Sequence, residues 1–129
     1  MDIVQIETNL LKALAHPARL RIIQVLAQDE ACVCHLTAIL QKRQPYVSQH
    51  LMVLREAGLV VDRRDGLMVY YRLAHPGPEE LVAVLRQVVL AAHANAELPT
   101  VPAPPVKGCP CPKCDEARVA NTNAEALVQ

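Results

Sequence analysis

The sequence predicts a small, mainly α-helical protein that carries one β-hairpin. Apolar residues recur every three or four positions along most of the chain, as they do on the buried side of a helix. The spacing changes to an alternation of two on either side of Asp65-Gly66, a dipeptide typical of tight hairpin turns. The 129-residue chain has no Phe or Trp and only three Tyr, so its core must be aliphatic.

Four helices are expected before the hairpin. The first, Asp2–Ala15, ends at His16-Pro17 because the residue before a proline avoids the α region. The second runs from Pro17 to Ala27, and a polar break separates it from a short third helix at about Val33–Leu40. The fourth is Pro45–Ala57, where the proline occupies a first-turn position that needs no N–H donor. Gly58 ends it.

The third and fourth helices, joined by the polar turn Gln41–Gln44, form a helix-turn-helix. Val47, Leu51 and Leu54 give the fourth helix one buried stripe. Its other face opens with hydrogen-bonding side chains: Tyr46, Ser48, Gln49 and His50. Side chains at these positions meet base edges when a recognition helix enters the DNA major groove N-terminus first. An ordinary amphipathic helix is the alternative interpretation of this stretch alone.

Two strands, Leu59–Arg64 and Leu67–Leu73, follow the helix-turn-helix and predict a wing. Its tip carries Arg63, Arg64 and Asp65, where they would contact the DNA backbone or minor groove. A hairpin that only caps the core is the alternative.

The formal net charge is zero, but the charges are segregated along the chain. Residues 41–72 contain six basic and three acidic residues, and the rest contains seven basic and ten acidic. The basic residues of this stretch are Lys42, Arg43, Arg55, Arg63, Arg64 and Arg72. Because phosphate contacts dominate DNA affinity, we expect a duplex partner, with Arg55, Arg63, Arg64 and Arg72 among its contacts.

A last helix, Glu79–Asn95, is apolar nearly all round between Leu81 and Ala92. A helix that is apolar on every face must be buried on every face, so we expect a homodimer that pairs through the first and last helices. Twofold symmetry would present two recognition helices to a roughly palindromic site. We assign residues 1–96 to this DNA-binding and dimerisation domain. Residues 97–129 are expected to form a weakly ordered tail that begins with a proline-rich spacer.

Five cysteines form two clusters, Cys32/Cys34 and Cys109/Cys111/Cys114. The chain shows no secretion signal and no apolar run long enough to span a membrane, which favours a cytoplasmic protein. In that compartment, closely spaced cysteines indicate metal or redox ligands rather than a disulfide framework. The alternative for Cys32 and Cys34 is that they are two small buried apolar residues. The alternative for the tail cysteines is that they are incidental thiols in an unstructured segment.

These motifs together resemble the ArsR/SmtB family of metal(loid)-responsive bacterial repressors over about Leu10 to Leu90. The resemblance rests on residues 14–23, 30–36, 44–51 and the wing at 62–73. It implies a winged helix-turn-helix homodimer that binds operator DNA without metal and leaves it when the ligand binds. It places Gln44, Ser48, Gln49 and His50 at DNA-reading positions. It also places Cys32 and Cys34 at the family's thiolate site, at the start of the third helix.

Two departures from the family bear on the ligand set. No cysteine precedes Cys32, and the last helix lacks the acid and histidine pattern of the family's other metal site. Any third ligand must therefore come from Cys109, Cys111 or Cys114, as in relatives that use a C-terminal cysteine.

The thiolates predict a soft ligand. Three sulfurs suit arsenite or antimonite, the first choice, or Cd(II) or Pb(II), and four would suit Zn(II) or Cd(II). Residues two apart on a helix face different ways, so Cys32 and Cys34 can share an ion only if the helix start is irregular. We expect ligand binding to remodel that start and shift the recognition helix. A separate metal site formed within the tail is the alternative interpretation of the tail cysteines.

Three other functions compete with that of a metal-responsive repressor. A thiol-redox or persulfide sensor would join Cys32 or Cys34 to a tail cysteine. A winged-helix interaction module with a zinc-stapled tail would bind no operator. A cysteine arsenate reductase needs Arg six residues after its cysteine, which none of the five cysteines has, so we expect neither an enzyme nor a small-molecule substrate.

Overall fold

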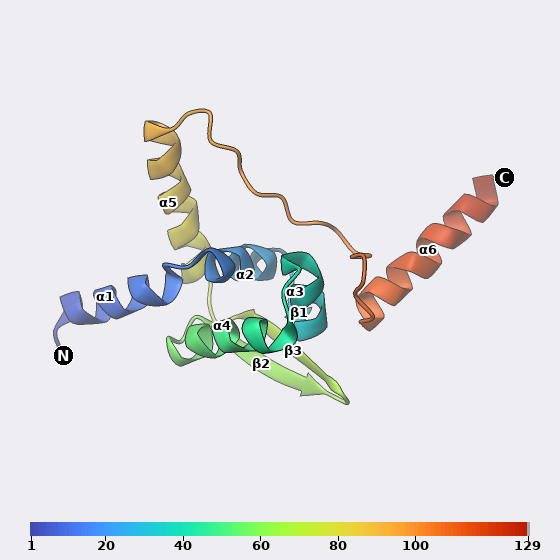
Figure 1. Cartoon of the computed structure of the whole chain (residues 1–129), viewed down its shortest axis with the longest axis horizontal. Helices are drawn as coiled ribbons and strands as arrows, with labels where there is room; N and C mark the ends of the chain where they lie inside the picture. The colour runs from blue at the N-terminus through green and yellow to red at the C-terminus, as the bar shows by residue number, and fades with distance from the viewer. Residues whose placement is uncertain (129) are drawn as a thin grey trace.

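The structure, a computed structural model, describes the backbone of residues 1–128 and the side chains of residues 1–122 (Figure 1). Its elements in chain order are α1 (Ile3–Leu14), α2 (Pro17–Gln28), β1 (Ala31–Cys32), α3 (Val33–Leu40), α4 (Gln44–Glu56), β2 (Val60–Asp65), β3 (Met68–Leu73), α5 (Gly77–Ala92) and α6 (Pro112–Val128). The expected mainly helical fold with one hairpin is confirmed.

The core lies where α2, α3 and α4 meet. Ile22 and Ile23 of α2, Leu36 of α3, and Leu51 and Leu54 of α4 have no exposed surface. Burying each such side chain contributes about 1.5–3 kcal/mol, so this aliphatic cluster fixes the angle between the two helices of the helix-turn-helix.

The turn between α3 and α4 is tight. Gln41 ends α3 in the left-handed conformation, with φ of 55°, and its N–H donates to the carbonyl of Thr37. Pro45 lies in the first turn of α4, as expected. The helix-turn-helix predicted from the sequence is confirmed.

The wing is a three-stranded antiparallel sheet rather than a hairpin alone. Its strand order is β1-β3-β2, and Gly66 turns the hairpin with φ of 61°. The third strand, β1, pairs Cys32 with Tyr70 of β3. A two-residue strand shows no alternation, so the sequence offered no pattern for it. The pairing ties the first cysteine pair directly to the wing.

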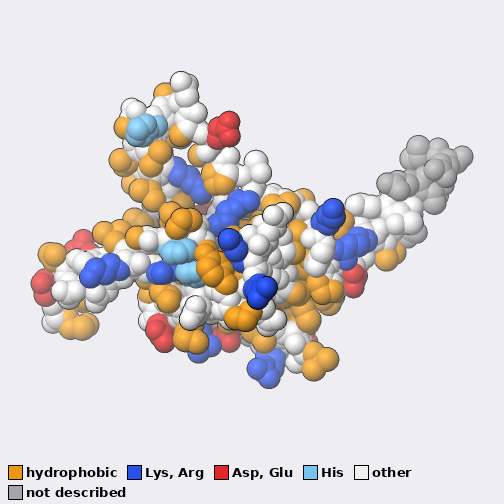
Figure 2. Space-filling model, in the orientation of Figure 1, with side chains coloured by type: hydrophobic (Ala, Val, Ile, Leu, Met, Phe, Trp, Pro, Cys, Tyr) orange, Lys and Arg blue, Asp and Glu red, His pale blue; other side chains and the backbone are white. Residues whose placement is uncertain are grey.

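Helices α1 and α5 extend away from this core (Figure 1). Only Pro78 and Val82 of α5 are buried within the chain, while Val84 is 54% and Val88 64% exposed. In Figure 2, apolar side chains gather over both projecting helices. None of the described helices combines the length and apolarity that crossing a membrane requires.

The tail differs from the expectation of weak order. After an extended spacer it forms α6, beginning at Pro112, and residue 129 lies outside the described part. The Ala-rich sequence from Asp115 onward has good intrinsic helix propensity, which accounts for this helix. Before α6, the segment around Val106 and Cys109 packs against α3.

Candidate metal centre and DNA-facing surface

The first cysteine pair lies where β1 becomes α3. Cys32 has extended backbone angles and is the N-cap of α3, where its Sγ accepts the N–H of His35 at 3.3 Å. Because Cys32 is outside the helix, its sulfur reaches that of Cys34, and the two are paired as a disulfide. The irregular helix start that a shared ion requires is therefore built into the fold.

The tail cysteines come back to the same place. Cys109, Cys111 and Cys114 are at most 2% exposed. Two overlapping groups have all their ligand atoms within 4.8 Å of one another. One joins Cys32 and Cys34 to Cys109 and Cys111, and the other joins His35 to all three tail cysteines. The structure thus brings together, within one chain, all five cysteines that the sequence singled out.

His35 is a candidate ligand that the sequence did not single out. Its side chain is 6% exposed, and its Nδ1 lies 3.3 Å from the sulfur of Cys114, 3.7 Å from that of Cys109 and 3.9 Å from that of Cys111. Its position directly after Cys34 was the only available signal.

The loop that carries the tail cysteines is held by its own hydrogen bonds. The Arg118 guanidinium donates to the carbonyls of Val106 and Cys109, at 2.8 and 2.6 Å. The Val106 N–H donates to the sulfur of Cys114 at 3.3 Å. These bonds fix the loop before any ligand arrives.

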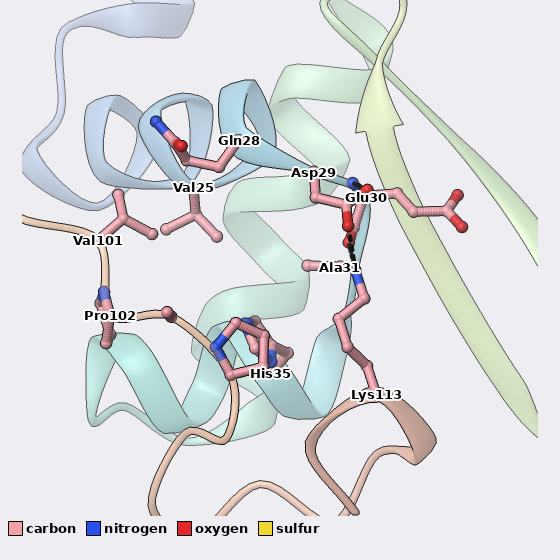
Figure 3. Close-up of a pocket in the computed structure, with 11 residues that line it drawn as sticks. Val25, Gln28, Asp29, Glu30, Ala31, His35, Val101, Pro102 and Lys113 are labelled. Carbon is pink, nitrogen blue, oxygen red and sulfur yellow. Dashed lines mark hydrogen bonds and ion pairs between the residues drawn. The ribbon is translucent and has the colours of Figure 1, made fainter. Parts of the chain in front are cut away.

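Lys113 joins this loop to the domain. Its Nζ lies 2.6 Å from a carboxylate oxygen of Asp29 and 3.0 Å from the carbonyl of Glu30. Figure 3 shows Lys113 extending from the tail toward both residues, across a pocket of about 250 Å³ that His35 also lines. The hydrogen bond from Lys113 lowers the pKa of Asp29.

Burial and hydrogen bonding set the proton affinities at this centre. Burial raises the pKa of the Cys109 thiol to about 12. Burial also acts to raise the pKa of Cys111, but hydrogen bonds from the Cys114 N–H and the neighbouring thiols outweigh it and lower that pKa. Burial, with the charge of Lys113, lowers the pKa of His35. The fold therefore favours a neutral imidazole, the form that binds metals.

The face of α4 opposite the core carries the predicted base-reading residues. Gln44 and Gln49 are exposed, and Ser48 is half-buried. The rings of Tyr46 and His50 pack together at 4.6 Å between centroids, and His50 Nδ1 accepts the Nε–H of Arg19 at 3.2 Å. These two rings thus help to join α4 to α2. Base contact by any of the five residues stays a prediction.

The four predicted arginines have different surroundings. The guanidinium of Arg63 makes two hydrogen bonds to the Glu30 carboxylate and lies 4.6 Å from the Tyr70 ring centroid. Arg55 pairs with Asp62 at 3.4 Å. Arg64 and Arg72 are exposed on neighbouring strands of the wing. The guanidinium of Arg63 is therefore turned toward Glu30, next to β1, rather than free at the tip of the wing.

A small pocket connects the thiolates with the DNA-facing elements. Cys32, Cys34, Gln44, Met68 and Val69 line the same hollow of about 170 Å³. It therefore borders α3, the first residue of α4 and the wing at once. A change at the sulfurs can reach both DNA-facing elements through adjacent contacts.

A helix-turn-helix followed by paired strands, with an exposed polar face on the second helix, defines a winged-helix DNA-binding protein. The sequence model described as "Bacterial regulatory protein, arsR family" matches residues 16–61. The chain belongs to the ArsR family of bacterial transcriptional regulators, whose members are not enzymes.

Curated relatives agree with this assignment. The chain is 48% identical over 86 residues to the biofilm growth-associated repressor of Agrobacterium fabrum, covering 67% of this chain and 74% of that protein. It is 47% identical over 79 residues to the arsenic resistance transcriptional regulator ArsR1 of Pseudomonas putida, covering 60% and 62%. It is also 47% identical over 67 residues to the arsenical resistance operon repressor of Escherichia coli, covering 51% and 57%. The chain thus spans less than two thirds of both arsenic regulators.

Solved structures show the same fold. The crystal structure of Rv0081 of Mycobacterium tuberculosis aligns with a TM-score of 0.68 and 35% identity, over 74% of this chain and 96% of that one. The solution structure of the homodimeric winged helix-turn-helix domain Mb0332 of Mycobacterium bovis aligns with a TM-score of 0.64 and 31% identity, over 77% and 91%.

Proposed function

We propose that this chain is a soft-ion-responsive transcriptional repressor that binds operator DNA as a cytoplasmic homodimer. Arsenite or antimonite is the preferred inducer, ahead of Cd(II), Pb(II) and Zn(II). The ion would be held by the thiolates of Cys32 and Cys34 with one or two from the tail. The observation that carries the proposal is the group of four sulfurs beside the start of α4.

The donor set favours a soft, thiophilic ion. Cys32, Cys34, Cys109 and Cys111 offer only sulfur, and their atoms lie within 4.8 Å of one another. Three of these sulfurs suit the trigonal geometry of arsenite, whereas all four suit tetrahedral Cd(II) or Zn(II). The arsenic-resistance names of two relatives support the first choice.

The position of Cys32 suggests how binding would reach the DNA. Its sulfur caps α3, and its backbone pairs with Tyr70 of the wing. Drawing that sulfur toward an ion would weaken the cap and shift β1 against β3. Gln44, at the start of α4, lines the same hollow as the sulfurs and would move with them. DNA affinity falls if the ion favours this shifted arrangement.

Fluorescence anisotropy on DNA from upstream of the protein's own gene tests this function. We expect the reduced, metal-free protein to bind and arsenite to release it near stoichiometrically. Cys32→Ser/Cys34→Ser should still bind DNA but ignore arsenite. Cys114→Ser is the matched control, because Cys114 is outside the four-sulfur group, and it should still respond. If arsenite still releases the double variant from DNA, the assignment of Cys32 and Cys34 as ligands is overturned. If the wild-type protein shows no specific DNA binding, the interaction module is favoured instead.

A thiol-redox sensor is the second candidate. The sequence predicted a bond from Cys32 or Cys34 to a tail cysteine, but the structure pairs Cys32 with Cys34 and leaves the three tail cysteines as free thiols. This direct pairing favours a redox sensor in which the two residues form the bond with each other. It would lose DNA when a mild disulfide-forming oxidant is added without any metal, and recover on reduction. The same anisotropy assay, run with a chelator present, separates the two candidates.

A further inference from the structure

The second ligand group has a different chemistry from the four-sulfur group. It contains the imidazole of His35 and the thiols of Cys109, Cys111 and Cys114, all buried. Neither Cys32 nor Cys34 belongs to it. A mixed nitrogen and sulfur set of this kind is typical of structural zinc, whereas the inducer proposed above needs only sulfur.

The distances fit a tetrahedral ion. With Zn–S bonds of about 2.3 Å and Zn–N bonds of about 2.0 Å, a tetrahedral site separates the nitrogen from each sulfur by about 3.5 Å. His35 Nδ1 lies 3.3, 3.7 and 3.9 Å from the three sulfurs. These three distances are close to the nitrogen–sulfur separation of a tetrahedral site, and all four ligand atoms lie within 4.8 Å of one another.

The surroundings also fit a structural site. The sulfur of Cys114 accepts the Val106 N–H, which partly offsets the charge of a thiolate. Arg118 donates to the carbonyls of Val106 and Cys109 and so holds the first part of the loop. Lys113 brings a positive charge beside a site whose three thiolates and one divalent ion sum to −1. The ligands come from a loop of six residues and from one residue of α3, so an ion there joins two distant parts of the chain.

We propose that His35, Cys109, Cys111 and Cys114 form a second, structural Zn(II) site that fastens the tail to α3. His35 Nδ1 binds as the neutral ring with its proton on Nε2. Each thiol that binds loses its proton to the buffer, so up to three protons are released per ion and no redox step is involved. This site shares Cys109 and Cys111 with the four-sulfur group and differs from it by His35 and Cys114, so the two groups compete for the shared sulfurs.

Two variants distinguish this site from the four-sulfur group. Cys114 belongs only to the proposed zinc site, and Cys34 belongs only to the other group. The full-length reduced protein, dialysed against Zn(II) and then analysed for metal, should hold one ion per chain that Cys34→Ser retains and Cys114→Ser loses. The proposal is overturned if Cys114→Ser retains the ion and Cys34→Ser loses it, if both variants retain it, or if both lose it.

Co(II) in place of Zn(II) tests the nitrogen ligand. The wild-type protein should give the intense visible bands of tetrahedral Co(II), with a spectrum typical of three sulfurs and one nitrogen. His35→Cys should keep the ion and change the bands to those of four sulfurs, whereas His35→Asn should weaken binding. A wild-type four-sulfur spectrum, or a His35→Asn spectrum and affinity equal to wild type, would overturn the proposal. Circular dichroism checks that each variant keeps its helices, and no arm depends on DNA, so failure here is separate from failure of the repressor function.

Discussion

At the scale of single residues, His50 shows how the recognition helix is held. Its ring lies 4.2 Å from that of His16 between centroids, and its Nδ1 accepts a hydrogen bond from Arg19. Burial, then the nearby charges of His16 and Arg19, lower its pKa. The folded protein therefore favours the neutral ring, with its proton on Nε2.

This arrangement predicts a pH-dependent stability. Because the folded pKa of His50 is below its unfolded value of about 6.5, its contribution is complete above that pH and is lost as the pH falls below it. The melting temperature of wild type should fall more between about pH 8 and about pH 5.5 than that of His50→Gln. Equal falls in the two proteins would show that His50 does not couple protonation to folding.

Arg63 and Glu30 form the other informative residue pair. The Arg63 guanidinium is held by two hydrogen bonds to Glu30, which lower the pKa of that carboxyl. The exposed pair contributes little to stability. It does decide where a positive charge of the wing lies when DNA approaches.

Breaking this pair should strengthen DNA binding. Glu30→Gln removes the charge that holds Arg63, so Arg63 becomes available to a DNA phosphate. The slope of log affinity against log salt concentration should then become steeper by about one, which corresponds to one more phosphate contact. Anisotropy titrations at several salt concentrations measure the slope. The same substitution in an Arg63→Ala background is the control and should leave the slope unchanged. A steeper slope in both backgrounds would assign the effect to general charge instead.

At the scale of elements, α5 packs against α2 on one side but leaves much of its apolar surface exposed in the described part of the chain. Val84 and Val88 lie one turn apart and are more than half exposed, and Val84 lines an apolar pocket together with Leu11 and Leu14 of α1. A surface of this kind is usually buried in an interface. The related winged-helix domain Mb0332 is homodimeric.

A charge on this surface should separate the dimer. Val88→Glu would bury an unpaired carboxylate in the proposed interface, so the dissociation constant should rise by at least about tenfold. Gln87→Glu adds the same charge to a neighbouring exposed position that faces α2, and it should leave the dimer intact. Sedimentation equilibrium measures both. A dimeric Val88→Glu protein would exclude this face of α5 as the interface.

The elements differ in how far the sequence could predict them. The helix-turn-helix and the hairpin follow from local patterns: the stripe of Val47, Leu51 and Leu54, and the alternation around Gly66. Strand β1 could not be predicted from a local pattern, because two residues are too few to show a period. The role of His35 was also beyond sequence reasoning, because its sulfur neighbours lie at least 74 residues further along the chain. Only the three-dimensional path of the tail brings them together.

At the scale of the whole molecule, the tail and the domain have separate cores. The buried residues of the main cluster run from Ala13 to Val82, and only Val101 of the spacer packs against it. The second cluster contains Val106 and the tail cysteines, and it meets the domain at Cys32. The domain should therefore fold without the tail, which completes the ligand sets instead.

A chain ending at Glu97 tests this division of roles. It should unfold cooperatively, remain dimeric and bind operator DNA with an affinity similar to that of the full chain. The reason is that α4 and the wing keep their contacts with the main cluster, although Met68 and Tyr70 of β3 lose their packing against the tail. It should fail to release DNA with arsenite, because Cys32 and Cys34 alone supply two sulfurs where the trigonal site needs three. Anisotropy with and without arsenite measures both properties.

The full-length variant Cys109→Ser/Cys111→Ser/Cys114→Ser separates loss of the thiols from loss of the chain. It should match the truncated protein in both DNA affinity and arsenite response if the tail acts only through its sulfurs. A truncated protein that still responds would place the third ligand outside the tail. A truncated protein that does not fold would show that the packing of Val106 and its neighbours on α3 stabilises the domain itself, so that residues 1–97 are not an independent unit.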